Sequence, residues 1–313
     1  VEHSPAVSLV AAHLPDVEMT PFHIAGPLPD LDGPPDAWEN LVGVRPEDEP
    51  KFILLAEPFS TRSQTLLAGL DYAFPNSPKI GGLASGGTSP GLNTLFFDEE
   101  AFSEGAIGVA LVGNVVMDTV VAQGCRPVGD LMRVTNCEGN WLHELDGRPA
   151  FEVARDLYSD LGERDRRLAE TALFAGVLMD EFVEEPGPGD FLVRNVLGAD
   201  PHRGALAIGE NLQPGMRLQF HVRDAETSAE DLHTLLGSYE SGPGNVRGSL
   251  LFSCLGRGEH LYGRPNFDTG LFREEVGPIP IGGFFCNGEI GPVGGSTFLH
   301  GYTSSFALFK PRF

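Results

Sequence analysis

The side chains best suited to chemistry gather near the end of the chain, in residues 281–305, IGGFFCNGEIGPVGGSTFLHGYTSS. The stretch offers a thiol, an amide, a carboxylate, an imidazole and a phenol, from Cys286, Asn287, Glu289, His300 and Tyr302. In a strand, His300 and Tyr302 would share one face, because side chains alternate along a strand. Such groups among glycines favour a ligand pocket. The alternative is that Asn and Glu cap turns while His300 is a hydrogen-bonded core residue.

Cysteine-based catalysis is a second chemistry that this stretch could support. Cys286 would be the nucleophile, with His300 as its base and Asn287 to orient the base. No familiar nucleophile signature surrounds Cys286 or the other candidate thiol, Cys125. The sequence therefore favours binding over catalysis and assigns no catalytic residue. A cysteine-dependent enzyme that acts on a small metabolite stays an alternative.

A second candidate element is the loop GCRPVG, residues 124–129, which holds Cys125 and Arg126 between glycines. Pro127 restricts its own backbone and pushes Arg126 towards extended geometry. A guanidinium presented in this way can bind both oxygens of a carboxylate. The alternative is a turn whose arginine pairs with an acidic neighbour.

Patterns for metals and cofactors are missing from the sequence. The nine histidines are scattered without an H-x-x-x-H pair, and the four cysteines form no C-x-x-C pair. The glycine-rich runs fit neither the dinucleotide pattern nor the phosphate-binding loop pattern. We therefore expect no metal and no cofactor.

Charge and hydropathy limit the partners of the chain. The formal net charge is −23 and the isoelectric point is near 4.6, which disfavours binding to nucleic acid. No apolar run reaches the roughly 18 residues that span a bilayer, and no secretory signal is visible. The sequence predicts an acidic cytoplasmic protein with reduced cysteines and no membrane partner.

Hydrophobic periodicity predicts alternating strands and helices. Strands are expected at 6–14, 51–59, 173–180, 190–198, 204–209, 216–224 and 248–254, and a hairpin within 124–147. Helices are expected at 60–74, as a pair within 148–172, and at 228–240, whereas 27–40 looks like a loop. The composition shift at residues 145–150 is the best boundary, which predicts domains of residues 1–147 and 148–313.

Three short blocks recur in the same order and indicate an internal duplication. FILLAEPF (52–59) is similar to SLLFSCLG (249–256), IGGLASGG (80–87) to IGGFFCNG (281–288), and GVALV (108–112) to SFALF (305–309). The predicted fold is α/β, leaning towards α+β, with two related strand-rich halves and mixed sheets flanked by helices. The two glycine loops are expected to face one cleft.

Several motifs in order resemble the FIST family. They are GCRPVG, ELDGRPA, RNVLGADPHRGALAIG, SLLFSCLGRGEHLYG, IGGFFCNGEIGPVGG and LHGYTSSFALF, and the resemblance is weakest over the first 50 residues. It implies a sensory protein with FIST N-terminal and C-terminal segments, for which amino acids have been proposed as ligands. It implies no established catalytic residues, and any signalling partner would be a separate protein.

The leading hypothesis is a cytoplasmic small-molecule sensor for signal transduction that binds an amino acid or a similar carboxylate. Its predicted ligand-binding residues are Cys125, Arg126, Cys286, Asn287, Glu289, His300 and Tyr302. Arg126 would hold an α-carboxylate, and Glu289 or Asn287 an α-amino group. The other alternative is a protein-interaction adaptor without a ligand, which would expose an apolar patch instead of a pocket.

Overall fold

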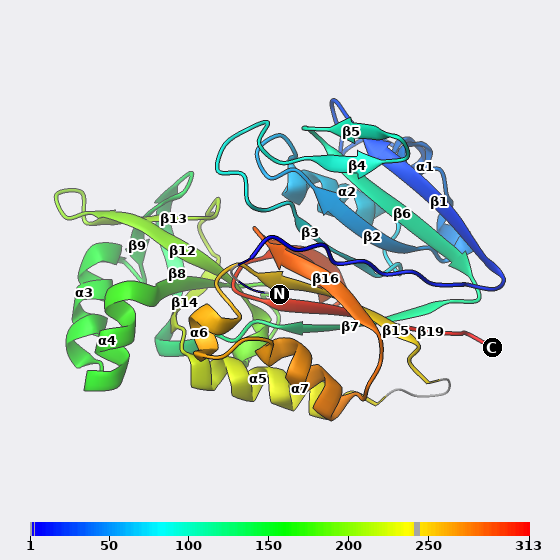
Figure 1. Ribbon diagram of the computed structural model, residues 1–313. Helices are drawn as coiled ribbons and strands as arrows, with labels where there is room; N and C mark the ends of the chain where they lie inside the picture. The colour runs from blue at the N-terminus through cyan, green and yellow to red at the C-terminus, as the bar shows by residue number, and fades with distance from the viewer. Residues whose placement is uncertain (1, 3, 241–244) are drawn as a thin grey trace. The chain divides into compact units, whose positions relative to one another are not determined.

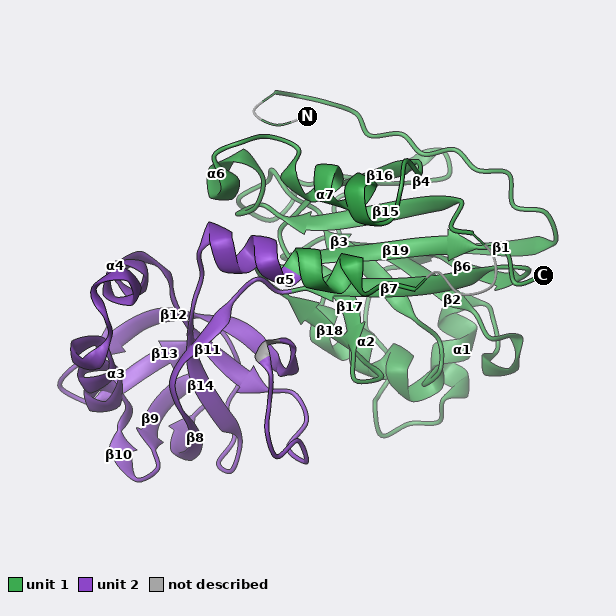
Figure 2. Cartoon of the chain, turned by 90° about the horizontal axis from the view of Figure 1, so that it is seen from below, with its two compact units in different colours: residues 1–122, 232–313 green, residues 123–231 purple. Residues whose placement is uncertain are grey.

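The computed structural model describes residue 2 and residues 4–240 and 245–313. The chain forms two compact units, which Figure 2 distinguishes by colour. The first unit combines residues 1–122 with residues 232–313, and the second contains residues 123–231. The second unit is thus inserted in sequence between the two parts of the first.

A six-stranded mixed sheet forms one half of the first unit, in the order β1-β6-β2-β3-β17-β18 (Figure 1). Its strands are β1 (Val17–Ile24), β2 (Lys51–Ala56), β3 (Lys79–Leu83), β6 (Ala106–Gly113), β17 (Glu289–Val293) and β18 (Ser296–His300). Strands β2 and β3 are parallel, and the other pairs are antiparallel. A small hairpin, β4 (Leu95–Phe97) and β5 (Glu100–Phe102), stands apart from this sheet.

A four-stranded sheet in the same unit repeats this arrangement, in the order β16-β15-β19-β7. Its strands are β7 (Val116–Ala122), β15 (Gly248–Cys254), β16 (Ile281–Cys286) and β19 (Ser304–Lys310). In each sheet a central strand has a parallel partner on one side and an antiparallel partner on the other. The three sequence blocks fall on these corresponding strands, so the predicted duplication is confirmed.

The first unit has four layers, because both faces of its two sheets are covered. Side chains of β2 alternate, so Phe52 and Leu54 pack under α1 (Asp36–Val42) and α2 (Ser63–Ala73), while Ile53 faces the other sheet. The four-stranded sheet packs against α7 (Phe267–Glu275) and the end of α5 (Ala225–Gly237) (Figures 1 and 2). A short helix, α6 (Glu259–Tyr262), precedes α7.

One glycine in each copy lets two parallel strands approach closely. A Cβ on Gly81 would lie 1.8 Å from the carbonyl oxygen of Leu54, and a Cβ on Gly283 would lie 1.8 Å from that of Leu251. Leu54 and Leu251 occupy the same position in the repeated blocks, and each is opposite its glycine in the strand register. The structure therefore equates Gly81 with Gly283, one position away from the sequence alignment of the I-G-G segments.

Replacing either of these glycines by alanine is expected to lower the free energy of unfolding by about 1–3 kcal/mol, because the new Cβ must push two strands apart. Urea titration would measure the loss for Gly81→Ala and Gly283→Ala. Gly270→Ala is a suitable control, since a Cβ on this helical glycine would meet nothing within 4 Å. Unchanged stability in both strand variants would contradict the expectation.

The second unit is built on an antiparallel sheet that closes on itself, because β8 pairs with both β14 and β9. Its strands are β8 (Arg126–Glu138), β9 (Trp141–Leu145), β10 (Arg148–Pro149), β11 (Leu173–Leu178), β12 (Phe191–Asp200), β13 (Ala205–Ile208) and β14 (Arg217–Val222). Two helices, α3 (Ala150–Asp160) and α4 (Glu163–Ala172), contribute to its core. Short 3-10 turns lie at Pro46–Asp48 in the first unit and Pro188–Asp190 in this one.

The predicted elements agree with the structure except near the N-terminus and before β16. The strand predicted at 6–14 is wrong: these residues are extended but belong to no strand, and the first strand is β1. The loop predicted at 27–40 contains the start of α1, whose Trp38 is fully buried. The sequence analysis also missed α6 and α7. The strand error matters, because residues 4–8 form one wall of a cavity.

Candidate functional site

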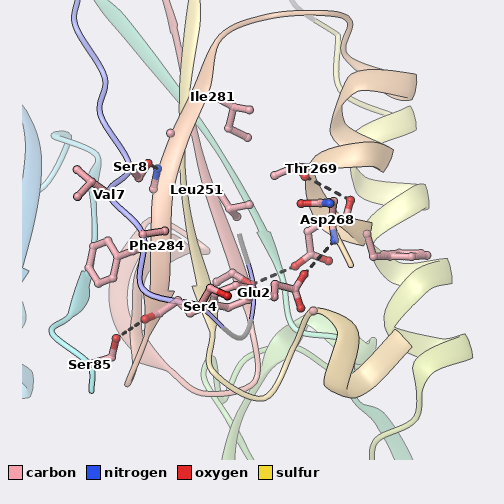
Figure 3. Close-up of a pocket in the computed structure, with 18 of the residues that line it drawn as sticks. Glu2, Ser4, Val7, Ser8, Ser85, Leu251, Asp268, Thr269, Ile281 and Phe284 are labelled. Atoms are coloured by element: carbon pink, nitrogen blue, oxygen red, sulfur yellow. Dashed lines mark hydrogen bonds between the residues drawn. The ribbon is translucent and has the colours of Figure 1, made fainter. Parts of the chain in front are cut away.

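A cavity of about 720 Å³ lies in the first unit along β16, the edge strand of the four-stranded sheet. It reaches Ser253 near the carboxyl end of β15 and residues 266–269 at the start of α7. Sheets with parallel strands and helical connections commonly bind ligands at the carboxyl ends of the strands. Figure 3 shows the segment before β1 running beside β16 and bordering the cavity.

The walls of the cavity combine apolar and polar side chains in similar numbers. The apolar side chains come from Val7, Leu251, Phe267, Ile281, Phe284 and Phe285, and the polar ones from Glu2, Ser4, Ser8, Ser85, Ser253, Asp268 and Thr269. Ser85 belongs to the glycine loop of the first copy, and its hydroxyl donates a hydrogen bond to the carbonyl of Phe285 in the second copy. The site therefore joins both copies of the duplicated element.

The N-terminal segment is held by one hydrogen bond to β16 and by hydrogen bonds from Glu259 and Asn266, which lie between β15 and α7. The hydroxyl of Ser8 accepts a hydrogen bond from the backbone N–H of Gly283 at 3.0 Å. The carboxylate of Glu2 accepts one from the N–H of Asn266 at 2.9 Å and another from the N–H of Glu259. Edge strands present unpaired backbone groups, so this segment covers part of an otherwise open edge.

A buried ion pair lies behind the cavity. The guanidinium of Arg257 is fully buried and donates hydrogen bonds to both carboxylate oxygens of Asp268, at 3.1 and 3.2 Å. It also donates to the hydroxyl of Tyr262 and, at 3.3 Å, to the carbonyl of Tyr302. This network ties the loop after β15 to α7 and to the turn before β19.

Asp268 lines the cavity as an ionised carboxylate. Burial by itself would raise its pKa, but the positive charge and hydrogen bonds of Arg257 outweigh burial and hold the pKa below its usual range. The hydroxyls of Ser304 and Ser253 add hydrogen bonds at 2.8 and 3.0 Å. The negative charge of Asp268 is therefore already balanced before any ligand binds.

The C-terminal residues of the predicted site meet next to this cavity, in the interior of the same unit. Glu289 and His300 are buried and lie opposite each other on β17 and β18. The carboxylate of Glu289 accepts a hydrogen bond from the N–H of Thr303 at 3.1 Å, and Nε2 of His300 donates one to the carbonyl of Gly291 at 3.0 Å. Both groups have structural hydrogen bonds, and their part in ligand binding stays a prediction.

The two glycine loops are joined by backbone hydrogen bonds. The N–H of Asn287 donates to the carbonyl of Leu83 at 3.2 Å, and the N–H of Leu83 donates to the carbonyl of Gly288 at 2.8 Å. The strand predicted to carry both His300 and Tyr302 ends at His300, and Tyr302 lies two residues later in a left-handed backbone conformation with φ of 67°. None of the seven predicted residues is among the described residues that line the cavity.

The thiol of Cys286 is poorly suited to act as a nucleophile. Burial, followed by the nearby charge of Glu289, raises its pKa far above the usual value for a thiol. Catalytic cysteines need a lowered pKa, because the thiolate is the reactive species. The environment of Cys286 therefore favours a structural role.

Cys125 and Arg126 belong to the second unit, whereas the other five predicted residues belong to the first. Cys125 is buried. Both ends of the Arg126 guanidinium donate hydrogen bonds to the carboxylate of Asp165 in α4, one of them at 3.2 Å. This is the acidic neighbour that the sequence analysis offered as the alternative to a ligand.

Two family models match nearly the whole chain. The FIST N domain matches residues 2–148, and the FIST C domain matches residues 150–292. The chain belongs to the FIST family. FIST domains are associated with sensory signal transduction, and the resemblance inferred from the motifs is confirmed.

Relatives of this FIST protein occur in bacteria and plants. An uncharacterized protein of Mycobacterium tuberculosis is 40% identical over 258 residues, which cover 82% of this chain and 67% of the relative. An uncharacterized protein of Mycobacterium bovis is similar to the same extent. An F-box/LRR-repeat protein of Arabidopsis thaliana is 29% identical over 142 residues, 40% of this chain and 27% of that protein.

Two further findings concern metals and membranes. Within residues 4–240 and 245–313 and residue 2, no group of three or more His, Cys, Asp or Glu side chains is placed to hold a metal ion. Over the same part of the chain, no helix combines the length and the apolar character needed to cross a bilayer.

The sequence analysis did not select the residues that build the cavity of this FIST protein. Arg257 lies in the motif SLLFSCLGRGEHLYG, which was used only for the family resemblance. An arginine between two glycines directly after a buried strand was an available signal. Glu2 carried no comparable signal, because it meets Glu259 and Asn266 only through contacts between distant parts of the chain.

Proposed function

We propose that this FIST protein is a sensory protein that binds a small carboxylate ligand, such as an amino acid, in the cavity along β16. The observation that supports the proposal is the cavity of about 720 Å³, whose walls offer both apolar and polar side chains to a ligand. A volume of this size lies within the roughly 300–1,000 Å³ of typical small-molecule sites. The association of FIST domains with signal transduction supports the further proposal that a separate protein reads the bound state.

A thermal-shift screen of the twenty amino acids tests this function. A ligand that binds only the folded state stabilises it, by about 2.7 kcal/mol at a concentration of 100 times Kd, so at least one amino acid should raise Tm. Thr269→Trp should fill the cavity and abolish the shift while leaving the Tm without ligand nearly unchanged, because Thr269 lines the cavity and is only half-buried.

Arg126→Ala serves as the comparison, because Arg126 lies in the second unit. The proposal expects the ligand-induced shift to survive in this variant. Loss of the shift in Arg126→Ala but not in Thr269→Trp would move the site to Arg126. If none of the twenty amino acids raises Tm, the proposal that the ligand is an amino acid is wrong.

A further inference from the structure

The cavity already contains a carboxylate that belongs to the chain itself. Glu2 lines it, and the backbone N–H groups of Glu259 and Asn266 both donate to this side chain, one to each carboxylate oxygen. Glu259 is the first residue of α6, and Asn266 is the residue immediately before α7. Because both donors point to one carboxylate, they form a binding position for an anionic group at the edge of a cavity that also has apolar side chains in its walls (Figure 3).

The binding position is shaped for this group. A Cβ on Gly258 would lie 2.5 Å from the same Glu2 oxygen that accepts the hydrogen bond from Glu259, so only glycine leaves room for the carboxylate there. Gly258 also has φ of 73°, a conformation that glycine adopts without strain. The neighbouring carboxylate of Asp268 is already bonded to Arg257 and does not compete for these donors.

Among the residues that the structure describes, residues 4–12 bury little apolar surface. Val7 lines the cavity yet remains 91% exposed, and Leu9 is 86% exposed. Residues 4–12 form no strand with β16, and Ser8 supplies a single hydrogen bond to Gly283. Hydrophobic stabilisation is proportional to the apolar area removed from water. Release of the segment therefore costs little hydrophobic free energy.

We infer that Glu2 is a built-in competitor for the ligand. The carboxylate of a small ligand with an apolar body takes the place of the Glu2 carboxylate on the N–H groups of Glu259 and Asn266, and residues 4–8 leave β16 as it binds. This inference rests on the proposed function and adds its regulation. Release of the segment converts occupancy of the cavity into a change at the protein surface that a partner can detect.

The first test needs no ligand. Hydrogen–deuterium exchange of the full chain is compared between Glu2→Ala and the control Glu104→Ala, which alters an exposed carboxylate in the turn before β6. Glu2→Ala should speed exchange at the amides of Glu259 and Asn266, which lose their acceptor, and at the amide of Gly283, because Ser8 is no longer held beside it. The control should leave these amides unchanged. Equal exchange in the two variants would show that Glu2 does not hold the segment, which overturns the inference.

The second test measures competition with a matched pair of probes, isovalerate and isovaleramide. In the wild type, a ligand can bind only those molecules in which Glu2 has left the N–H groups of Glu259 and Asn266, and this lowers the apparent affinity. Isovalerate should therefore bind Glu2→Ala about tenfold more tightly than the wild type. It should also speed exchange at the amide of Gly283 in the wild type, because Ser8 leaves this amide when residues 4–8 are displaced. Isovaleramide, which lacks the charge, should do neither.

The outcomes separate the two proposals. If isovalerate binds the wild type and Glu2→Ala with equal affinity, Glu2 does not compete with the ligand, while the ligand site itself remains supported. A segment loosened by Glu2→Ala, together with no binding of isovalerate or of any amino acid to either variant, would overturn the ligand site and the competition with it.

Discussion

Replacing Arg257 by methionine is expected to lower the free energy of unfolding of the first unit by about 3–5 kcal/mol, because it leaves the buried carboxylate of Asp268 without its counter-charge. Arg257 is fully buried, and Asp268 has only 7% of its side chain exposed, so water cannot replace the lost partner. Each unit contains one tryptophan, Trp38 in the first and Trp141 in the second. Urea unfolding followed by fluorescence in a Trp141→Phe background therefore reports the first unit.

Two companion variants make this result specific. Arg247→Met removes an exposed arginine from the same unit and should change stability by no more than about 0.5 kcal/mol. The double variant Arg257→Met with Asp268→Leu should recover part of the loss, since it removes the unpaired charge as well. A double variant that is as unstable as the sum of its parts would contradict the ion-pair explanation.

Acidification is expected to destabilise the second unit through His221. Burial lowers the pKa of His221 to about 4 from 6.5, although the hydrogen bond to the carbonyl of Gln219 opposes this shift. The imidazole packs edge-to-face against Phe191 at 4.8 Å and fits where Gly176 lacks a Cβ. The site thus accommodates the neutral ring and disfavours the charged one.

The sign of the pH dependence follows from proton counting. Between pH 6.5 and 4 the unfolded chain holds a proton on His221 and the folded chain does not. The contribution of His221 to the free energy of unfolding is therefore constant above pH 6.5. It falls as the pH drops towards 4, by about 3 kcal/mol in total.

Denaturant titrations at several pH values would measure this slope for the second unit. His221→Phe should remove most of it, whereas His202→Phe, which alters an exposed histidine of the same unit, should retain it. An unchanged slope in His221→Phe would assign the acid sensitivity to other groups.

Much of the fold could be predicted because its signals are local. The alternation in KFILLA and the amphipathic patterns of α3 and α4 depend on neighbours along the chain, and the structure confirms them. The duplication was also readable, since each copy repeats a strand, an I-G-G segment and a later strand. Its register was one residue off, because only the pairing of Leu54 with Gly81 and of Leu251 with Gly283 defines it.

The N-terminal strand was mispredicted for a different reason. The apolar residues of AVSLVAAHL suit a strand, but β16 uses this segment only as a cover held through Ser8 and Glu2. Pairing between parts of the chain more than 250 residues apart leaves no periodic trace in either part. The sequence also does not show which polar side chains have partners within the fold. It therefore selected Glu289 and His300 as ligand-binding candidates, although both form buried hydrogen bonds.

By itself the sequence determined the family, the duplicated α/β architecture and the importance of the glycine segments, because these depend on residue order and local conformation. Only the tertiary structure decided where a ligand could fit. The cavity, the Arg257–Asp268 pair and the binding position of Glu2 arise where β15, β16, α7 and the N-terminal segment meet. Such a site depends on distances between residues far apart in the chain, and these become defined only when the layers pack.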